Sequence, residues 1–156
     1  MPFCVMDSPV GRLYLGEEDG ALTALGRTSE PLCPPETPLL EEAVRQLRAY
    51  FDGTLTTCDL PLKTHGTVFQ ERCWAALRDI PYGATVTYGE QARRIGSPKA
   101  FRAVGGANHH NPISIVIPCH RVVGANGSLT GYGGGLNMKE WLLDHEKRVL
   151  ENAKKR

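Results

Sequence analysis

The chain has 156 residues, of which 41% are hydrophobic and 22% charged, and its formal net charge is +1. This composition is typical of a folded globular protein, because a disordered chain has fewer apolar residues and a larger net charge. No segment approaches the roughly 18 uncharged apolar residues of a membrane-spanning helix, and we expect neither membrane association nor a secretory signal.

The charge is unevenly distributed along the chain. Residues 1–60 carry four basic and ten acidic side chains, a balance of −6, whereas residues 61–156 carry fourteen basic and seven acidic ones, a balance of +7. The second part could therefore face a polyanion, and the first part could not. A solvated basic face on an ordinary domain is the alternative explanation.

The cysteine content indicates the redox environment. The chain has five cysteines, an odd number, and none of them has CxxC spacing. Both facts argue against a disulfide framework and favour a reducing compartment. We therefore expect a cytoplasmic protein whose cysteines are thiols.

The first part of the chain predicts a small antiparallel sheet followed by a helix. Leu13–Leu15 and Leu22–Leu25 are strand candidates, and Asp19-Gly20 between them is a hairpin signal. After a proline-rich loop, apolar residues recur at helical spacing from Leu39 to Phe51, and Gly53 ends that helix.

Residues 54–66 resemble a linker, so we expect an N-terminal α/β lobe at residues 1–60 and a second domain at residues 61–156. The second domain begins with a capping box at Thr67–Gln70, which opens a helix that Pro81 and Gly83 stop.

A pair of short helices follows. A second capping box at Thr87–Glu90 opens a helix to about Ile95, and Ser97, as N-cap before Pro98, starts another that runs to about His109. Because Gly96 lies in the turn between them, the pair is a helix-turn-helix candidate. Small residues in its second helix would let either a large partner or a neighbouring helix approach closely. The predicted fold class is α+β, with an N-terminal sheet and helix before a mainly helical domain.

The residues best suited to chemistry follow a β-branched apolar segment, Ile113–Ile117, which we expect to be buried and extended. Cys119 comes after a proline and before His120 and Arg121, and neighbouring cations lower a thiol pKa from its reference of about 8.5. A histidine base needs an acid to orient it, and Glu146 and Asp144 are both candidates. A buried structural cysteine is the alternative.

The segment Ile117-Pro118-Cys119-His120-Arg121-Val122-Val123 resembles the active-site signature of the O6-alkylguanine-DNA alkyltransferases. The resemblance covers about residues 67–148, in order and spacing. The other matching segments are Pro81-Tyr82-Gly83, Thr87-Tyr88, Arg102-Ala103-Val104-Gly105, Asn111-Pro112, Gly134-Gly135-Leu136 and Lys139-Glu140-Trp141-Leu142-Leu143-Asp144-His145-Glu146.

The resemblance implies direct-reversal DNA repair, in which one molecule acts once. Cys119 would take a methyl or larger alkyl group from O6 of guanine, or from O4 of thymine, in duplex DNA. His120 would act on Cys119 as a base through a water, and Glu146 would orient His120. Asn111 would brace the turn, and the hydroxyl of Tyr88 would give a proton to the guanine. No cofactor is implied, and we expect a monomer.

The resemblance also implies how DNA is bound. Arg102 would enter the duplex and fill the gap left by the flipped base, and the second helix would lie in the minor groove. The remaining expected DNA contacts are Tyr88, Lys99, Ala103, Gly105 and Arg121. The expected pocket residues are Val122, Tyr132, Gly133 and Gly134. The two glycines would leave the rim of the pocket open, so we expect adducts larger than methyl to be accepted.

Some members of this family bind zinc in the N-terminal lobe. Cys4 and Cys33 are available here, but His65 is the only histidine before residue 109, so we expect no metal. We expect His109 and His110 at a helix C-terminus, with DNA phosphate as the second choice, and Trp74 and Trp141 in the core.

Two other classes of function remain open from the sequence. A DNA-damage binding module would recognise the lesion without chemistry, which the presence of Cys119 disfavours. A cysteine hydrolase would need an oxyanion hole and a substrate cleft, which no segment indicates.

Overall fold

The computed structural model describes residues 1–125 and 136–154. It has the predicted α+β fold, with a three-stranded antiparallel sheet in the N-terminal part and mainly helices after it. The chain forms two compact units, Met1–Thr64 with Pro112–Val116, and His65–Asn111 with Ile117–Arg156. The domain boundary that we placed after residue 60 stays a prediction. Among the described residues, no helix is long and apolar enough to cross a membrane.

The first unit is a meander of three strands. The strands β1 (Phe3–Met6), β2 (Leu13–Glu18) and β3 (Ala21–Arg27) pair in the order β1-β2-β3. Asp19 and Gly20 turn the chain between β2 and β3 with φ of 53° and 77°, the left-handed conformation that a tight hairpin requires. The predicted hairpin is therefore confirmed.

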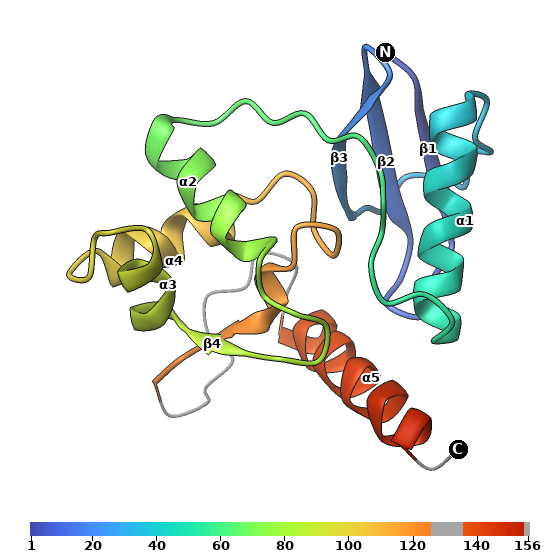
Figure 1. The fold of residues 1–156 in the computed structure, drawn as a ribbon. Coiled ribbons are helices and arrows are strands. Elements are labelled where there is room, and N and C mark those ends of the chain that lie inside the picture. The colour runs from blue at the N-terminus through green and yellow to red at the C-terminus, as the bar shows by residue number, and fades with distance from the viewer. Residues whose placement is uncertain (126–135, 155–156) are drawn as a thin grey trace. The chain divides into compact units, whose positions relative to one another are not determined.

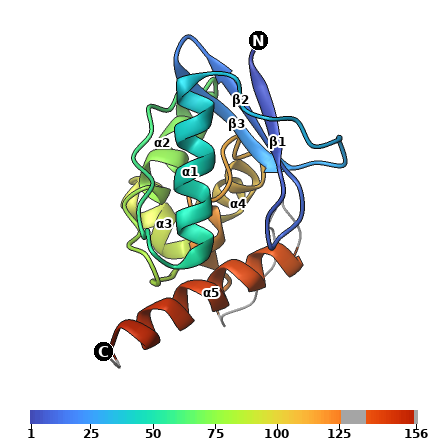
Figure 2. The ribbon, with the colours of Figure 1, turned by 90° about the vertical axis from the view of Figure 1, so that its right-hand side faces the viewer.

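One helix packs against the sheet of the first unit (Figure 1, Figure 2). This helix, α1 (Pro38–Asp52), begins one residue before the predicted start, where the Thr37 hydroxyl accepts from Leu40 N–H. Gly53 ends it with φ of 80° and donates to the last carbonyls. Leucines of β2 and β3 and the buried side of α1 form the core of this unit.

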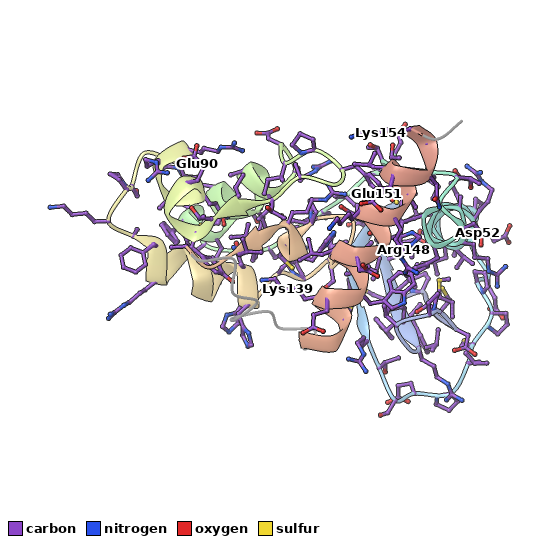
Figure 3. All side chains as sticks on the ribbon, turned by 90° about the horizontal axis from the view of Figure 1, so that it is seen from below. Asp52, Glu90, Lys139, Arg148, Glu151 and Lys154 are labelled. Atoms are coloured by element: carbon purple, nitrogen blue, oxygen red, sulfur yellow. The ribbon has the colours of Figure 1, made fainter. Side chains whose placement is uncertain are left out.

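The second unit begins with helix α2 (Val68–Leu77), which has the predicted capping box between Thr67 and Gln70. Two strands of two residues, β4 (Val86–Thr87) and β5 (Val122–Val123), pair in parallel. Helix α3 (Tyr88–Arg94) follows β4 directly, and Thr87 caps it by accepting from Glu90 N–H. Only this first half of the predicted capping box is present, because the carboxylate of Glu90, which Figure 3 labels, bonds Arg93 and Arg94 instead.

Helix α4 (Phe101–His109) begins later than predicted. Ser97 does not cap it; instead Ala100 N–H donates to Ser97 O, so residues 97–100 form a turn that contains Pro98. The turn precedes the helix because the first α-helical bond runs from Val104 N–H to Ala100 O. The two helices of the predicted pair are present, separated by residues 95–100.

Helices α2, α3 and α4 enclose a small core of their own (Figure 1). Its buried members are Cys73, Ala92, Ile95, Val104 and Ala107. Buried amides reinforce it, since Gln91 and Asn108 exchange hydrogen bonds of 3.0 and 2.7 Å through their side chains. The last helix, α5 (Leu136–Lys154), completes the unit.

Candidate active site

Cys119 lies in a tight turn of the second unit. Cys119 N–H donates to Ile117 O at 2.8 Å across Pro118, whose φ of −81° and ψ of 66° are those of an inverse γ-turn. A single 3₁₀ turn, η1 (Cys119–Arg121), follows, and Cys119 is 5% exposed. The rigid proline therefore fixes the backbone that presents the sulfur.

The segment before this turn is buried as predicted, but it is not extended. Ile113 forms one parallel bridge with Leu25, and Val116 N–H then donates to Ser114 O around Ile115, which has φ of 72°. A β-branched residue in the left-handed region is strained. The prediction of an extended segment was wrong. The β-branched residues indicate that the segment is buried, but its path depends on two backbone hydrogen bonds to Leu25.

Asn111 braces the turn from the end of α4. Its Nδ2 donates to Ile117 O at 2.7 Å, the same carbonyl that accepts from Cys119 N–H. A side-chain amide thereby closes the loop from Asn111 to Ile117, which ends two residues before Cys119. The contact is the one expected of an asparagine that holds the turn.

His120 is fully buried and bonded to an acid on α5. Its Nε2 lies 2.7 Å from Glu146 Oε2, while Asp144, the competing candidate, pairs with Arg148 at 3.2 Å. The other ring nitrogen, Nδ1, is buried and has no hydrogen-bond partner among the residues that the structure describes. Because Glu146 holds Nε2, Nδ1 is the ring atom that remains to exchange a proton.

Arg121 forms the other half of this buried network. Its Nε and Nη2 lie 3.0 Å from the two oxygens of Glu146, and its Nη1 donates to Ile80 O. We expected Arg121 to contact DNA, but the guanidinium is buried and satisfied within the protein. This buried position argues against a contact between Arg121 and DNA. The guanidinium instead fixes the position of the Glu146 carboxylate.

The network determines the ionisation of its members. Although burial opposes its charge, the bonds from His120 and Arg121 hold the pKa of Glu146 far below its usual range, so Glu146 is a carboxylate. Burial lowers the pKa of His120, against the opposing effect of Glu146. A neutral imidazole beside a carboxylate can accept a proton, and the carboxylate then stabilises the imidazolium.

Gly83 supplies the fourth contact to Glu146. Its N–H donates to Glu146 Oε1 at 2.9 Å, and its φ of 78° lies in the left-handed region. A Cβ atom at this position would overlap Leu150 Cδ1 of α5. The glycine therefore lets its backbone approach α5 closely enough to bond the carboxylate.

Replacing Gly83 with alanine is expected to lower the free energy of unfolding by about 1–2 kcal/mol, because alanine disfavours this φ and Leu150 must move. Urea unfolding measures the change. Gly106→Ala is the control, since its Cβ meets nothing within 4 Å and helical alanine is favoured by roughly 0.5–1 kcal/mol. Equal stability of wild type and Gly83→Ala would contradict the argument.

Two further polar groups lie within electrostatic reach of Cys119. Lys139, at the start of α5 (Figure 3), is fully buried, and its Nζ donates to Val122 O at 2.6 Å and lies 5.8 Å from the Tyr88 ring centroid. Burial lowers the pKa of Lys139, and a charge on Cys119 opposes that shift. Burial raises the pKa of Tyr88, and a charge on Cys119 raises it further. Tyr88 is therefore a protonated donor.

Other cysteines provide a contrast. Burial raises the pKa of Cys4 to about 11 and of Cys73 to about 11, so both are protonated thiols at neutral pH. Neither can act as a nucleophile in this state. None of the five cysteines, all of which the structure describes, forms a disulfide bond.

Of the basic residues expected at DNA, Lys99 lies in the turn before α4 and Arg102 lies on α4. Lys99, Arg102 and Ala103 are exposed, whereas Gly105 is half-buried, with the Tyr88 ring 3.8 Å from its would-be Cβ. His109 and His110 are exposed at the C-terminus of α4, as predicted.

Of the remaining predicted residues, Val122 is buried in β5. Tyr132, Gly133 and Gly134 lie outside the described residues. Trp74 is buried and donates to Ala107 O, whereas Trp141 is only half-buried and stacks on His145. Among the described residues, no three His, Cys, Asp or Glu side chains form a group that could hold a metal ion.

Sequence reasoning missed Lys139 and Gly83 as site residues, and it misplaced Arg121. A signal for Lys139 was available, since Lys139, Leu142 and Glu146 follow the i, i+3, i+7 spacing of one helix face. The Gly83 contact had no local signal, because it spans 63 residues.

Comparisons with known proteins show the family to which this chain belongs. Residues 68–148 match the family model described as 6-O-methylguanine DNA methyltransferase, DNA binding domain, and residues 3–64 match its ribonuclease-like domain. This chain belongs to the 6-O-methylguanine DNA methyltransferase family.

Individual family members are similar over nearly the whole chain. A methylated-DNA--protein-cysteine methyltransferase of Mycolicibacterium paratuberculosis is 52% identical, over 92% of this chain and 90% of the relative. One of Mycobacterium bovis is 53% identical, over 91% and 90%. The crystal structure of Mycobacterium tuberculosis OGT in complex with DNA has a TM-score of 0.87 and 50% identity, and covers 94% of this chain and 93% of that one.

Proposed function

We propose that this protein repairs alkylated duplex DNA by transferring the alkyl group from O6 of guanine to Cys119. The observation that carries the proposal is His120 Nδ1, on the residue after Cys119: this buried ring nitrogen has no hydrogen-bond partner within residues 1–125 and 136–154. Its other nitrogen is held by Glu146 at 2.7 Å. Family membership and the relatives' activity as methylated-DNA--protein-cysteine methyltransferases support the same reaction.

The transfer begins with loss of the thiol proton. His120 Nδ1 takes this proton from Cys119 through a bridging water, and Glu146 stabilises the imidazolium. The buried ammonium of Lys139 favours the thiolate, since opposite charges attract strongly where water is excluded. The sulfur is then a nucleophile at neutral pH.

The alkyl group moves in one displacement step. The sulfur forms a bond to the alkyl carbon while the bond from that carbon to O6 breaks, and the electron pair remains on the guanine. The Tyr88 hydroxyl donates a proton to the departing guanine and is reprotonated by the proton that left Cys119. The products are a thioether and unmodified guanine, so each molecule acts once.

DNA must open before the step can occur, because O6 of a stacked guanine is out of reach of a buried sulfur. The exposed Arg102 enters the duplex from α4 and occupies the space that the flipped nucleotide leaves. Lys99 and the arginines of α3 contact phosphates, so binding depends strongly on salt. The protein acts as a cytoplasmic monomer, without a cofactor.

The experiment incubates the protein with duplex DNA that contains O6-methylguanine and measures the mass of the intact protein. One added methyl group on Cys119, with no further turnover, is the expected result. Binding without a mass change would instead indicate a lesion-binding module. Release of product over many cycles would indicate a hydrolase.

Replacing Arg102 with alanine is expected to slow repair of duplex DNA by about ten- to a hundredfold, because a stacking contact is worth roughly 1–3 kcal/mol. Reaction with the free alkylated base should be unchanged, since no duplex is opened. Arg148→Ala is the matched control, an exposed arginine on α5. Equal losses on both substrates would exclude the role of Arg102 in opening the duplex.

A further inference from the structure

Phe101 is an exposed aromatic residue with no evident role in folding. It is the first residue of α4 and is 49% exposed, whereas Val104 and Ala107 of the same helix are buried in the core of the second unit. Single exposed apolar residues are common on proteins and need no explanation by themselves. The surroundings of Phe101 are what distinguish it.

The surroundings are strongly basic. Residues 88–105 carry four basic side chains, Arg93, Arg94, Lys99 and Arg102, and a single acid, Glu90. The four basic side chains are exposed, and Glu90 is already paired with Arg93 and Arg94. Such a surface complements a polyanion, but an apolar ring gains nothing from phosphate. The ring therefore suits the uncharged parts of a nucleic acid, its bases and sugars.

Phe101 and Arg102 occupy the same end of α4. Helical side chains tilt toward the helix N-terminus, so the side chains of Phe101 and Arg102 both point toward the N-terminal end of α4. The Arg102 guanidinium carbon lies 6.0 Å from the centroid of the Phe101 ring. The two side chains therefore lie side by side at the N-terminal end of α4.

We propose that Phe101 is an apolar wedge that enters duplex DNA beside Arg102 and contacts the base pair next to the flipped guanine. Proteins that kink DNA from the minor groove use phenylalanine in this way, because the ring covers base faces that unstacking exposes. Arg102 then bonds the orphaned base, and Phe101 covers the adjacent step. The inference rests on the proposed function, which supplies the duplex and the flipped base.

The test compares Phe101→Ala and Phe101→Leu with Val68→Ala. Val68 is the matched control, an apolar residue at the start of α2 that is 79% exposed. Each variant is measured for its transfer rate with duplex DNA containing O6-methylguanine and with the free alkylated base. Thermal unfolding of each variant shows whether folding is affected.

Phe101→Ala is expected to slow transfer from the duplex about tenfold, as loss of an aromatic stacking contact does. Transfer from the free base and the melting temperature should be unchanged. Phe101→Leu should lie between alanine and wild type, and Val68→Ala should equal wild type. The salt dependence of DNA binding by Phe101→Ala should equal that of the wild type, since no phosphate contact is lost.

A second measurement separates this inference from the proposed function. In a Cys119→Ala background, fluorescence of 2-aminopurine placed beside the lesion reports unstacking without any chemistry. Phe101→Ala should remove most of the increase that the background protein causes. If duplex transfer and fluorescence are both unaffected by Phe101→Ala, the wedge is excluded. Absence of transfer by the wild type, with the fluorescence effect intact, would overturn only the proposed reaction.

Discussion

Replacing Cys119 with alanine is expected to abolish alkyl transfer while leaving affinity for duplex DNA unchanged. The sulfur is the only atom of this residue that can form the thioether, and the substitution does not touch the exposed basic residues Arg93, Arg94, Lys99 and Arg102, which we propose to contact DNA. Mass spectrometry of the protein after incubation with O6-methylguanine DNA measures transfer, and fluorescence anisotropy measures binding.

Cys73→Ala is the control for this experiment. Cys73 is also a buried cysteine of the second unit, but burial raises its pKa to about 11, so it is inert as a nucleophile. We expect Cys73→Ala to accept one methyl group as the wild type does. A methyl group found on Cys119→Ala would mean that another residue is the acceptor.

Replacing Glu146 with glutamine is expected to lower the free energy of unfolding by about 3–5 kcal/mol, since the buried Arg121 loses its counter-charge. The same change removes the negative charge that stabilises a protonated His120 and replaces one of the two acceptor oxygens with an amide donor, so the rate of transfer falls as well. Urea unfolding and single-turnover kinetics measure the two effects. Glu151→Gln is the control on the same helix (Figure 3), an exposed residue whose replacement should change stability by less than about 0.5 kcal/mol.

The pH dependence of stability provides an independent test. The pKa of Glu146 is lowered in the folded protein, whereas in the unfolded chain it is about 4.3. Its contribution is therefore fully present above about pH 5 and is lost as pH falls through the unfolded value toward the folded one. The wild type should lose stability more steeply than Glu146→Gln over this range. If the variant does not fold, the wild-type titration still tests the argument, and a flat profile below pH 5 would contradict it.

Much of the local structure was readable from the sequence because short-range chemistry determines it. Thr67 with Gln70, and Asp19 with Gly20, form the predicted cap and hairpin through contacts between neighbouring residues. Ser97 failed as a cap because the turn through Pro98 competes for the same backbone, and a local pattern fits both arrangements. Strand β1 went unrecognised, since Phe3–Met6 lacks the alternation of apolar and polar residues that marks a half-buried strand.

The candidate site could likewise be predicted only in part from the sequence. The residue types around Cys119 and their resemblance to a family identified a nucleophile, a base and two possible acids. The choice of Glu146 over Asp144 required the rotation of α5, which brings one carboxylate to His120 and leaves the other at the surface with Arg148. The contacts of Arg121 and Lys139 could also be assigned only from the structure. A sequence does not distinguish a basic residue that contacts phosphate from one that donates to a buried acceptor.

The sequence alone thus predicted the α+β fold class, the approximate positions of helices α1 to α4 and Cys119 as the candidate nucleophile, since each depends on residue type and short spacing. Only the tertiary structure decided how the chain turns at Ile115, which acid holds His120 and where the charge of Arg121 goes. The His120–Glu146 and Arg121–Glu146 contacts join residues 26 and 25 positions apart, and the turn at Ile115 follows backbone bonds between Leu25 and residues 112 and 114. Burial and charge pairing stabilise these features, and both exist only after the chain has folded.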